Sequence, residues 1–166
     1  MSTSRSGHIE HVHDGNTVTF SHGYSVLSVR LWGVDCPEID QPFGTAATKA
    51  ARQFAEGEAA TLELKNVDDD RLVGRVHIAD TTLGAHLTKK GLAWHSREST
   101  TSDELKTLEQ NARTAERGLW TQDAPTPPWK HRRRLADTST EEVIKDLLPF
   151  ILGFIGTLIL VLLLAL

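Results

Sequence analysis

The chain has 166 residues, a formal net charge of −4 and a composition that is 39% hydrophobic and 24% charged. This length allows one domain of ordinary size, and the composition excludes a collagen-like or wholly disordered chain. Because Cys36 is the only cysteine, an internal disulfide and a cysteine-based zinc cluster are both excluded.

The first half of the chain is typical of short strands followed by a helix. Residues 1–7 are expected to be a flexible terminus. Strands are predicted over 17–20 and 27–34, and the turn between them makes a hairpin. Alanines then recur on one face between residues 45 and 56, which predicts a helix that ends at Gly57.

The second half of the domain adds strands and then helices. Strands are predicted over 61–65 and 73–79, and the alternation in the second strand directs Arg75 away from the core. A short helix is expected over 83–90, and a longer one lies within 101–118, between a capping-box sequence and a glycine. Strands followed by helices indicate an α+β domain with a small, partly closed barrel.

The C-terminal segment has the composition of a membrane span. Residues 147–166 hold 16 hydrophobic residues and no charge, and 20 helical residues cross about 30 Å. We therefore expect a single-pass C-terminal tail anchor; a buried core helix is the alternative. Residues 130–146 form a charged linker, whose basic run over 130–134 predicts a cytoplasmic domain. That run is either a contact for anionic lipid or nucleic acid, or a solvated linker.

Seven short motifs occur in a fixed order over about 120 residues, at 14–17, 29–38, 41–44, 73–75, 91–94, 118–120 and 127–129. In this order they resemble the thermonuclease (staphylococcal nuclease-like) family. The resemblance implies that residues 8–129 form a five-stranded oligonucleotide-binding (OB-fold) barrel with about three helices. It also implies action on both DNA and RNA, with cleavage that leaves 3′-phosphates.

The motif residues can also be interpreted chemically without the family. Phosphodiester hydrolysis must deprotonate a water and stabilise charge that grows on the phosphoryl oxygens. Glu38 can accept the proton, while Arg30 and Arg75 can form forked hydrogen bonds to phosphate. Asp35 and Glu38 project from a loop that Pro37 stiffens, and their hard oxygens suit Ca²⁺.

The resemblance assigns a role to each of these positions. It implies that Arg30 and Arg75 bind phosphate and stabilise the transition state, that Glu38 is the general base and that Asp35 is a calcium ligand. Cys36 stands where the family uses a backbone carbonyl for the metal.

Two positions depart from the family pattern. Asn16 replaces a second calcium-binding aspartate, so we expect weaker metal binding because its amide carries no charge. Val73 stands where tyrosine is usual before Gly-Arg, which changes the substrate contacts near the phosphate. Residues 1–129 also carry 13 basic and 18 acidic residues, a net charge of −5, which argues against strong non-specific binding of nucleic acid.

Some of these side chains have simpler interpretations. Arg30 and Glu38 would also fit an ion pair at a strand end. The acidic run at 68–70 would either bind a cation or form a solvated loop. His11 and His13 lie on one strand face, but a zinc site would need a third ligand that the sequence does not offer.

Two functional hypotheses follow. The first is a membrane-tethered, calcium-dependent nuclease that acts on single-stranded DNA or RNA and contacts the bilayer through residues 147–166, with no obligate protein partner evident. The second is a catalytically weak or inactive module that binds nucleic acid or protein at the membrane. Arg30, Glu38 and Arg75 favour the enzyme, whereas Asn16 and the acidic charge favour the binding module.

Overall fold

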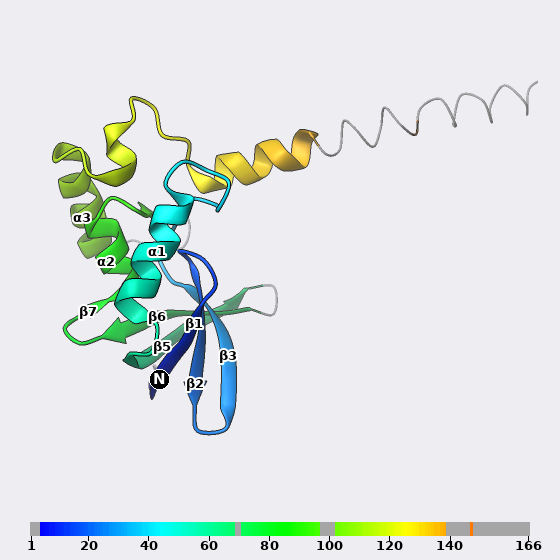
Figure 1. The fold of residues 1–166 in the computed structure, drawn as a ribbon, viewed down its shortest axis with the longest axis vertical. Helices are drawn as coiled ribbons and strands as arrows, with labels where there is room; N and C mark the ends of the chain where they lie inside the picture. The colour runs from blue at the N-terminus through cyan, green and yellow to red at the C-terminus, as the bar shows by residue number, and fades with distance from the viewer. Residues whose placement is uncertain (1–3, 69–70, 97–101, 139–146, 148–166) are drawn as a thin grey trace, which may run out of the picture. The chain divides into compact units, whose positions relative to one another are not determined.

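The structure is a computed structural model that describes residues 4–68, 71–96, 102–138 and 147. The chain divides into two compact units, residues 1–128 and residues 129–166. The first unit is α+β: it contains all the labelled strands and helices of Figure 1, and its three helices gather on one side of the strands.

Five strands of the first unit close into a barrel. They are β1 (Ser4–Val12), β2 (Thr17–His22), β3 (Ser25–Leu31), β5 (Ala59–Asp68) and β6 (Arg71–Ile78), and β7 (Thr81–Thr82) extends the sheet beyond β6. The order is β3-β2-β1-β5-β6 with antiparallel neighbours, and β6 returns to pair with β3 in parallel. This closed five-stranded barrel confirms the OB-type fold that the resemblance implied.

The barrel core follows from the alternation along each strand. Val18 and Phe20 of β2, Val29 of β3 and Leu62 of β5 are all fully buried. Burial of each large apolar side chain stabilises the fold by about 1.5–3 kcal/mol. The same alternation leaves Arg75 partly exposed on β6, as predicted.

Two strand predictions need correction. The expected strand over 27–34 ends at Leu31, because Gly33 adopts a φ of +79° and turns the chain before β4 (Val34–Asp35). β4 pairs instead with β8 (Trp94–His95). In addition, β1 begins at Ser4, inside the terminus that we expected to be flexible, because residues 4–8 pair with β5.

Three helices were predicted and are confirmed: α1 (Gly44–Ala55), α2 (Leu83–Lys89) and α3 (Asp103–Thr114), with a 3₁₀ helix η1 (Gly118–Thr121) after them. α1 buries Ala47, Ala51 and Ala55 completely. Ser102 caps α3 by accepting from the Leu105 N–H at 3.4 Å, so the helix begins within the predicted capping sequence.

The described residues also form a second, smaller apolar cluster, separate from the main core. Trp94, Ala112, Leu119 and Trp120 are buried together, and the two indole rings meet edge to face with centroids 5.4 Å apart. This cluster joins β8, α3 and η1, and it fixes where the chain from β8 runs beside β4.

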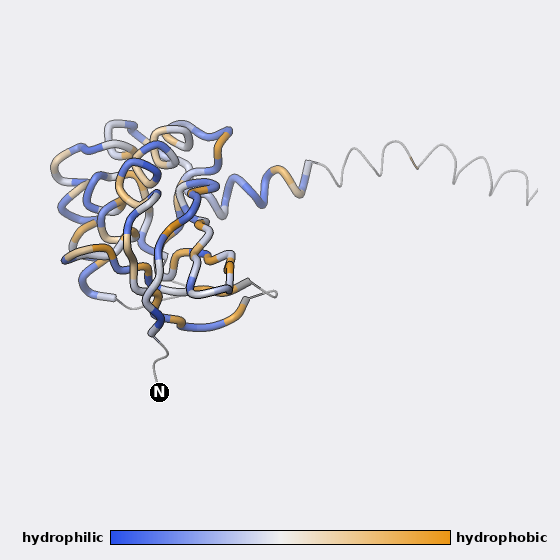
Figure 2. The backbone as a smooth tube through the Cα atoms, turned by 60° about the horizontal axis from the view of Figure 1, so that its bottom comes forward, coloured by the Kyte–Doolittle hydropathy of each residue, from blue (hydrophilic) through white to orange (hydrophobic). Residues whose placement is uncertain are grey.

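A helix over residues 128–138 begins at the last residue of the first unit, and Figure 2 shows that it is largely hydrophilic. Among the described residues, no helix is both long and apolar enough to cross a membrane. The predicted anchor at 147–166 lies, apart from Leu147, outside the described residues, as does the linker segment 139–146.

Candidate active site

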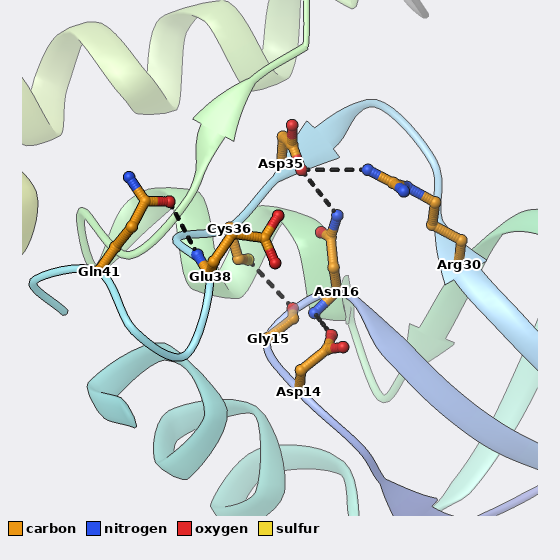
Figure 3. A network of polar contacts seen from close by, with 8 residues as sticks. All are labelled: Asp14, Gly15, Asn16, Arg30, Asp35, Cys36, Glu38 and Gln41. Atoms are coloured by element: carbon orange, nitrogen blue, oxygen red, sulfur yellow. Dashed lines mark hydrogen bonds and ion pairs between the residues drawn. The ribbon is translucent and has the colours of Figure 1, made fainter. Parts of the chain in front are cut away.

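Three of the predicted site residues meet at the end of the β2–β3 hairpin. The Arg30 guanidinium donates to Asp35 Oδ1 at 3.2 Å, and the Asn16 amide donates to the same oxygen at 3.0 Å. The Asp35 side chain is 7% exposed and that of Arg30 is 27% exposed. Figure 3 shows the three side chains converging from the start of β2, the end of β3 and β4.

Asn16 is held tightly by its own loop. Its backbone N–H donates to Asp14 Oδ1 at 2.7 Å, and its carbonyl accepts from the Leu31 N–H at 2.8 Å. Its side-chain oxygen Oδ1 is buried and has no hydrogen-bond donor within the part of the chain that the structure describes. A buried carbonyl oxygen without a donor costs about 1–3 kcal/mol, so this oxygen is suited to a cation.

Cys36 presents a thiol to the protein interior rather than a ligand to a metal. Its Sγ donates to the Gly15 carbonyl at 3.0 Å. Burial, reinforced by the nearby Asp35 carboxylate, raises the pKa of the thiol well above its ordinary value, so the neutral form persists at pH 7. Only the backbone of Cys36 therefore remains as a donor to a hard cation.

The oxygen donors of this site are few. No group of three or more His, Cys, Asp or Glu that could hold a metal ion occurs among the described residues. The oxygens available include Asn16 Oδ1, the Asp35 carboxylate and the backbone carbonyl of Cys36, a set that fits a hard cation and not zinc. His11 instead contacts Glu56 at 3.2 Å, and His13 contacts Thr19 at 2.7 Å.

Glu38 follows on the loop that leads to α1. Its backbone N–H donates to Gln41 Oε1 at 2.9 Å, and Gln41 Nε2 donates to the Thr126 carbonyl at 3.0 Å. A Cβ at Gly44 would lie 1.9 Å from the Glu38 carbonyl oxygen, so only glycine allows α1 to start this close to the loop. Figure 3 shows the Glu38 carboxylate directed toward Asn16.

Arg75 lies on β6, in contact with a different set of neighbours. Its NH1 is 3.7 Å from Glu63 Oε2 across the strand pair, and its Cζ is 4.2 Å from the ring centroid of Trp32. The ion pair that Arg30 makes with Asp35 is separate from these contacts. The structure thus brings together Asn16, Arg30 and Asp35, and it joins Arg75 to this part of the chain through Trp32.

Sequence reasoning did not single out two side chains that contact the predicted site residues, Trp32 and Gln41. Both lie inside motifs used for the resemblance, so their place in the chain was visible. Their contacts were not, because Trp32 meets Arg75 and Gln41 meets Thr126 only after the chain folds back over long distances. The acidic residues 69 and 70 lie outside the described residues.

A closed OB-type barrel with an arginine–carboxylate cluster at the end of one hairpin defines the class. Residues 28–122, more than half of the chain, match the family model described as staphylococcal nuclease homologue, and the chain belongs to this family. Its domain is a staphylococcal-like nuclease domain, and such a domain implies a nucleic acid substrate. Members of the family are generally metal-dependent.

The chain is also similar to several individual proteins. It is 29% identical over 130 residues to a protein of Escherichia coli named "uncharacterized endonuclease", an alignment that covers 77% of this chain and 85% of the relative. It is 32% identical over 108 residues to a "probable staphylococcal-like nuclease" of Oryza sativa subsp. japonica, covering 63% of this chain and 32% of the relative. It is 33% identical over 125 residues to an "uncharacterized 38.1 kDa protein" of Capnoides sempervirens, an alignment that covers 67% of this chain and 37% of the relative.

Proposed function

We propose that this protein is a calcium-dependent nuclease that hydrolyses phosphodiester bonds in single-stranded DNA and RNA and leaves 3′-phosphates. The observation that carries the proposal is the convergence of Arg30, Asn16 and Asp35, with the buried Asn16 Oδ1 lacking a donor among the described residues and the Glu38 carboxylate directed toward Asn16 (Figure 3). Membership of a nuclease family supports the class of reaction.

Each side chain has a definite part in the proposed reaction. Glu38 takes a proton from a water, which attacks the phosphorus atom as the bond to the 5′-oxygen breaks. The 5′-oxygen leaves as a hydroxyl after it gains a proton, and the phosphate stays on the 3′ side. Arg30 and Arg75 donate hydrogen bonds to the phosphoryl oxygens, whose charge grows in the transition state.

Asn16 and Asp35 are the residues that would hold the cation. When bound, Ca²⁺ supplies positive charge beside the scissile phosphate. Asp35 contributes a carboxylate that Arg30 and Asn16 already orient. Asn16 contributes an uncharged oxygen, so the affinity for calcium is lower than two carboxylates would provide.

A calcium series tests this proposal. The full chain in mild detergent is incubated with end-labelled single-stranded DNA or RNA, in calcium from micromolar to millimolar and in chelator. We expect both substrates to be cleaved only when calcium is present. Each product should carry a 3′-phosphate that a phosphatase removes. Cleavage that persists in chelator, or 5′-phosphate products, would contradict it.

A second candidate function is a binding module with weak or no catalysis. The neutral side chain at Asn16 favours it, because an uncharged ligand weakens the metal site. Tight binding of labelled single strands by a folded chain, without cleavage at millimolar calcium, would establish this module in place of the enzyme.

We also propose that residues 147–166 anchor the protein in a membrane with the nuclease domain on the cytoplasmic side. Support comes from the 16 hydrophobic residues among these 20 and from the basic run that precedes them. The full chain should float with lipid vesicles in a density gradient, whereas a chain that ends at residue 138 should stay at the bottom. Equal distributions would exclude the anchor.

A further inference from the structure

Trp32 joins the segment that carries Asp35 to the strand that carries Arg75. The backbone N–H of Trp32 donates to the Gly74 carbonyl at 2.9 Å, directly beside Arg75 on β6. Gly33 then turns the chain toward Asp35 with a φ of +79°. Because the backbone of Trp32 is tied to β6, its indole lies within reach of the Arg75 side chain.

The indole of Trp32 supports two cations. The Cζ atom of Arg75 lies 4.2 Å from the ring centroid, and Lys65 Nζ lies 5.4 Å from it. Both distances are within the range of about 6 Å in which the ring quadrupole attracts a cation. A guanidinium that stacks on a ring keeps its N–H edges for forked hydrogen bonds, which a lysine ammonium does not offer.

The edge of the Arg75 guanidinium faces Glu63, but the contact is loose. The Arg75 NH1–Glu63 Oε2 separation is 3.7 Å, whereas Lys65 Nζ is 2.6 Å and His77 Nε2 is 3.4 Å from the same carboxylate. One carboxylate thus serves three basic side chains, and Arg75 is the most distant of them. A phosphate can therefore replace Glu63 at Arg75 while Trp32 continues to support the guanidinium.

We infer that Trp32 is a positioning residue for the nuclease reaction: its ring holds the guanidinium plane of Arg75 so that a phosphate, and not Glu63, completes the hydrogen bonds. This inference rests on the role proposed for Arg75 above. It deepens that role, because neither the family match nor the motifs assign any task to Trp32.

Kinetics of Trp32 variants of the full chain test the inference. We expect Trp32→Leu to lower kcat about tenfold with a much smaller change in KM, and Trp32→Phe to keep most of kcat because its ring can still stack. In an Arg75→Ala background, Trp32→Leu should cause no further loss. Losses that multiply, or equal kcat values for Trp32→Leu and the unmodified chain, would overturn it.

Trp120→Phe is the matched control, because Trp120 also stacks on an arginine, Arg113, with Cζ 3.7 Å from its ring centroid. This control should leave kcat unchanged. If Trp32→Leu does not fold, Trp32→Met takes its place, since methionine also lacks a ring and its flexible side chain adapts to irregular gaps.

A second readout does not depend on activity. The Arg75 Nε–H resonance, assigned by its loss in Arg75→Ala, should carry a ring-current shift that disappears in Trp32→Leu and remains in Trp32→Phe. If the chemical shift of the Arg75 Nε–H is the same in Trp32→Leu as in the unmodified chain, the inference about Trp32 is overturned and the proposed function is not. A chain that never cleaves nucleic acid would instead overturn the proposed function, even where the resonance shows the stack.

Discussion

The molecule contains two groups of arginine, tryptophan and glutamate that differ in how tightly they are bound. We call Arg75, Trp32 and Glu63 the barrel triad. In it, the Arg75 Cζ lies 4.2 Å from the indole centroid, and the nearest ion-pair distance to Glu63 is 3.7 Å. The Glu63 side chain is 19% exposed.

The second group, which we call the helix triad, consists of Arg113, Trp120 and Glu109. Here the Cζ–centroid distance is 3.7 Å, and Arg113 donates twice to Glu109 Oε1, at 2.7 and 3.2 Å. Glu109 is 7% exposed, and Trp120 is buried against Trp94.

The comparison shows how the same three residue types serve different purposes. The helix triad satisfies its arginine within the protein and joins α3 to η1, so its interactions are committed to stability. The barrel triad leaves its arginine 3.7 Å from the nearest carboxylate oxygen, so this arginine can still bind a ligand.

The largest effect is expected on stability, from truncation in the helix triad. Trp120→Ala removes a buried indole from the cluster with Trp94 and should lower the free energy of unfolding by about 3–5 kcal/mol. Trp32→Ala removes a half-buried ring and should lower it by about 1 kcal/mol. Chemical denaturation of both variants measures the difference. Equal losses would show that the two triads are equally structural.

The second effect is on activity and reverses the ranking of the triads. Arg75→Ala should reduce kcat by about 10²–10³-fold, because one donor to the developing charge is lost. Arg113→Ala should leave kcat unchanged while it lowers stability, since the buried Glu109 carboxylate loses its partner. Single-turnover cleavage rates of the two variants measure this difference. An Arg75→Ala variant as active as Arg113→Ala would remove Arg75 from the mechanism.

A third prediction concerns the metal. Asn16→Asp should lower the calcium concentration for half-maximal activity by roughly tenfold, because a charged oxygen replaces a neutral one. Without calcium, the new carboxylate would face Asp35 and reduce stability, since the 3.0 Å amide contact becomes a repulsion between like charges. Calcium titrations of cleavage and of thermal unfolding measure both effects. An unchanged titration would contradict our interpretation of Asn16.

The smallest effect is expected at Cys36. Burial raises the pKa of its thiol, so the folded state releases the proton at higher pH than the unfolded state, whose ordinary value is 9.0. The stabilisation of the folded state by the protonated thiol is therefore retained below pH 9 and lost as the pH rises above it. Cys36→Ala should leave the calcium requirement unchanged and lessen the fall in melting temperature at alkaline pH. A changed calcium requirement would make the thiol a ligand.

The sequence predicted those features that depend on local patterns. Alternation along β6 identified Arg75 as outward-facing, and the capping sequence located the start of α3. The strand break at Gly33 was missed, because a single glycine with positive φ interrupts an otherwise continuous apolar pattern.

The missed contacts at the site depend on closure of the barrel. Trp32 meets Arg75 because β3 and β6, far apart in the chain, pair in parallel. Gln41 meets the Thr126 carbonyl through a similarly distant contact. The resemblance placed Arg30, Asp35 and Asn16 in one site, and the structure brings them together. The resemblance could not reveal which side chains contact Arg75.

The most direct test of the account is the rate of calcium-dependent cleavage by Glu38→Gln, measured beside the unmodified full chain and a Glu104→Gln control on the exposed side of α3. We expect the Glu38 variant to lose at least about 10²-fold in kcat, because its amide cannot accept the proton of the attacking water, and we expect the control to keep full activity. A Glu38→Gln variant that cleaves single-stranded DNA as fast as the control would contradict the proposed mechanism.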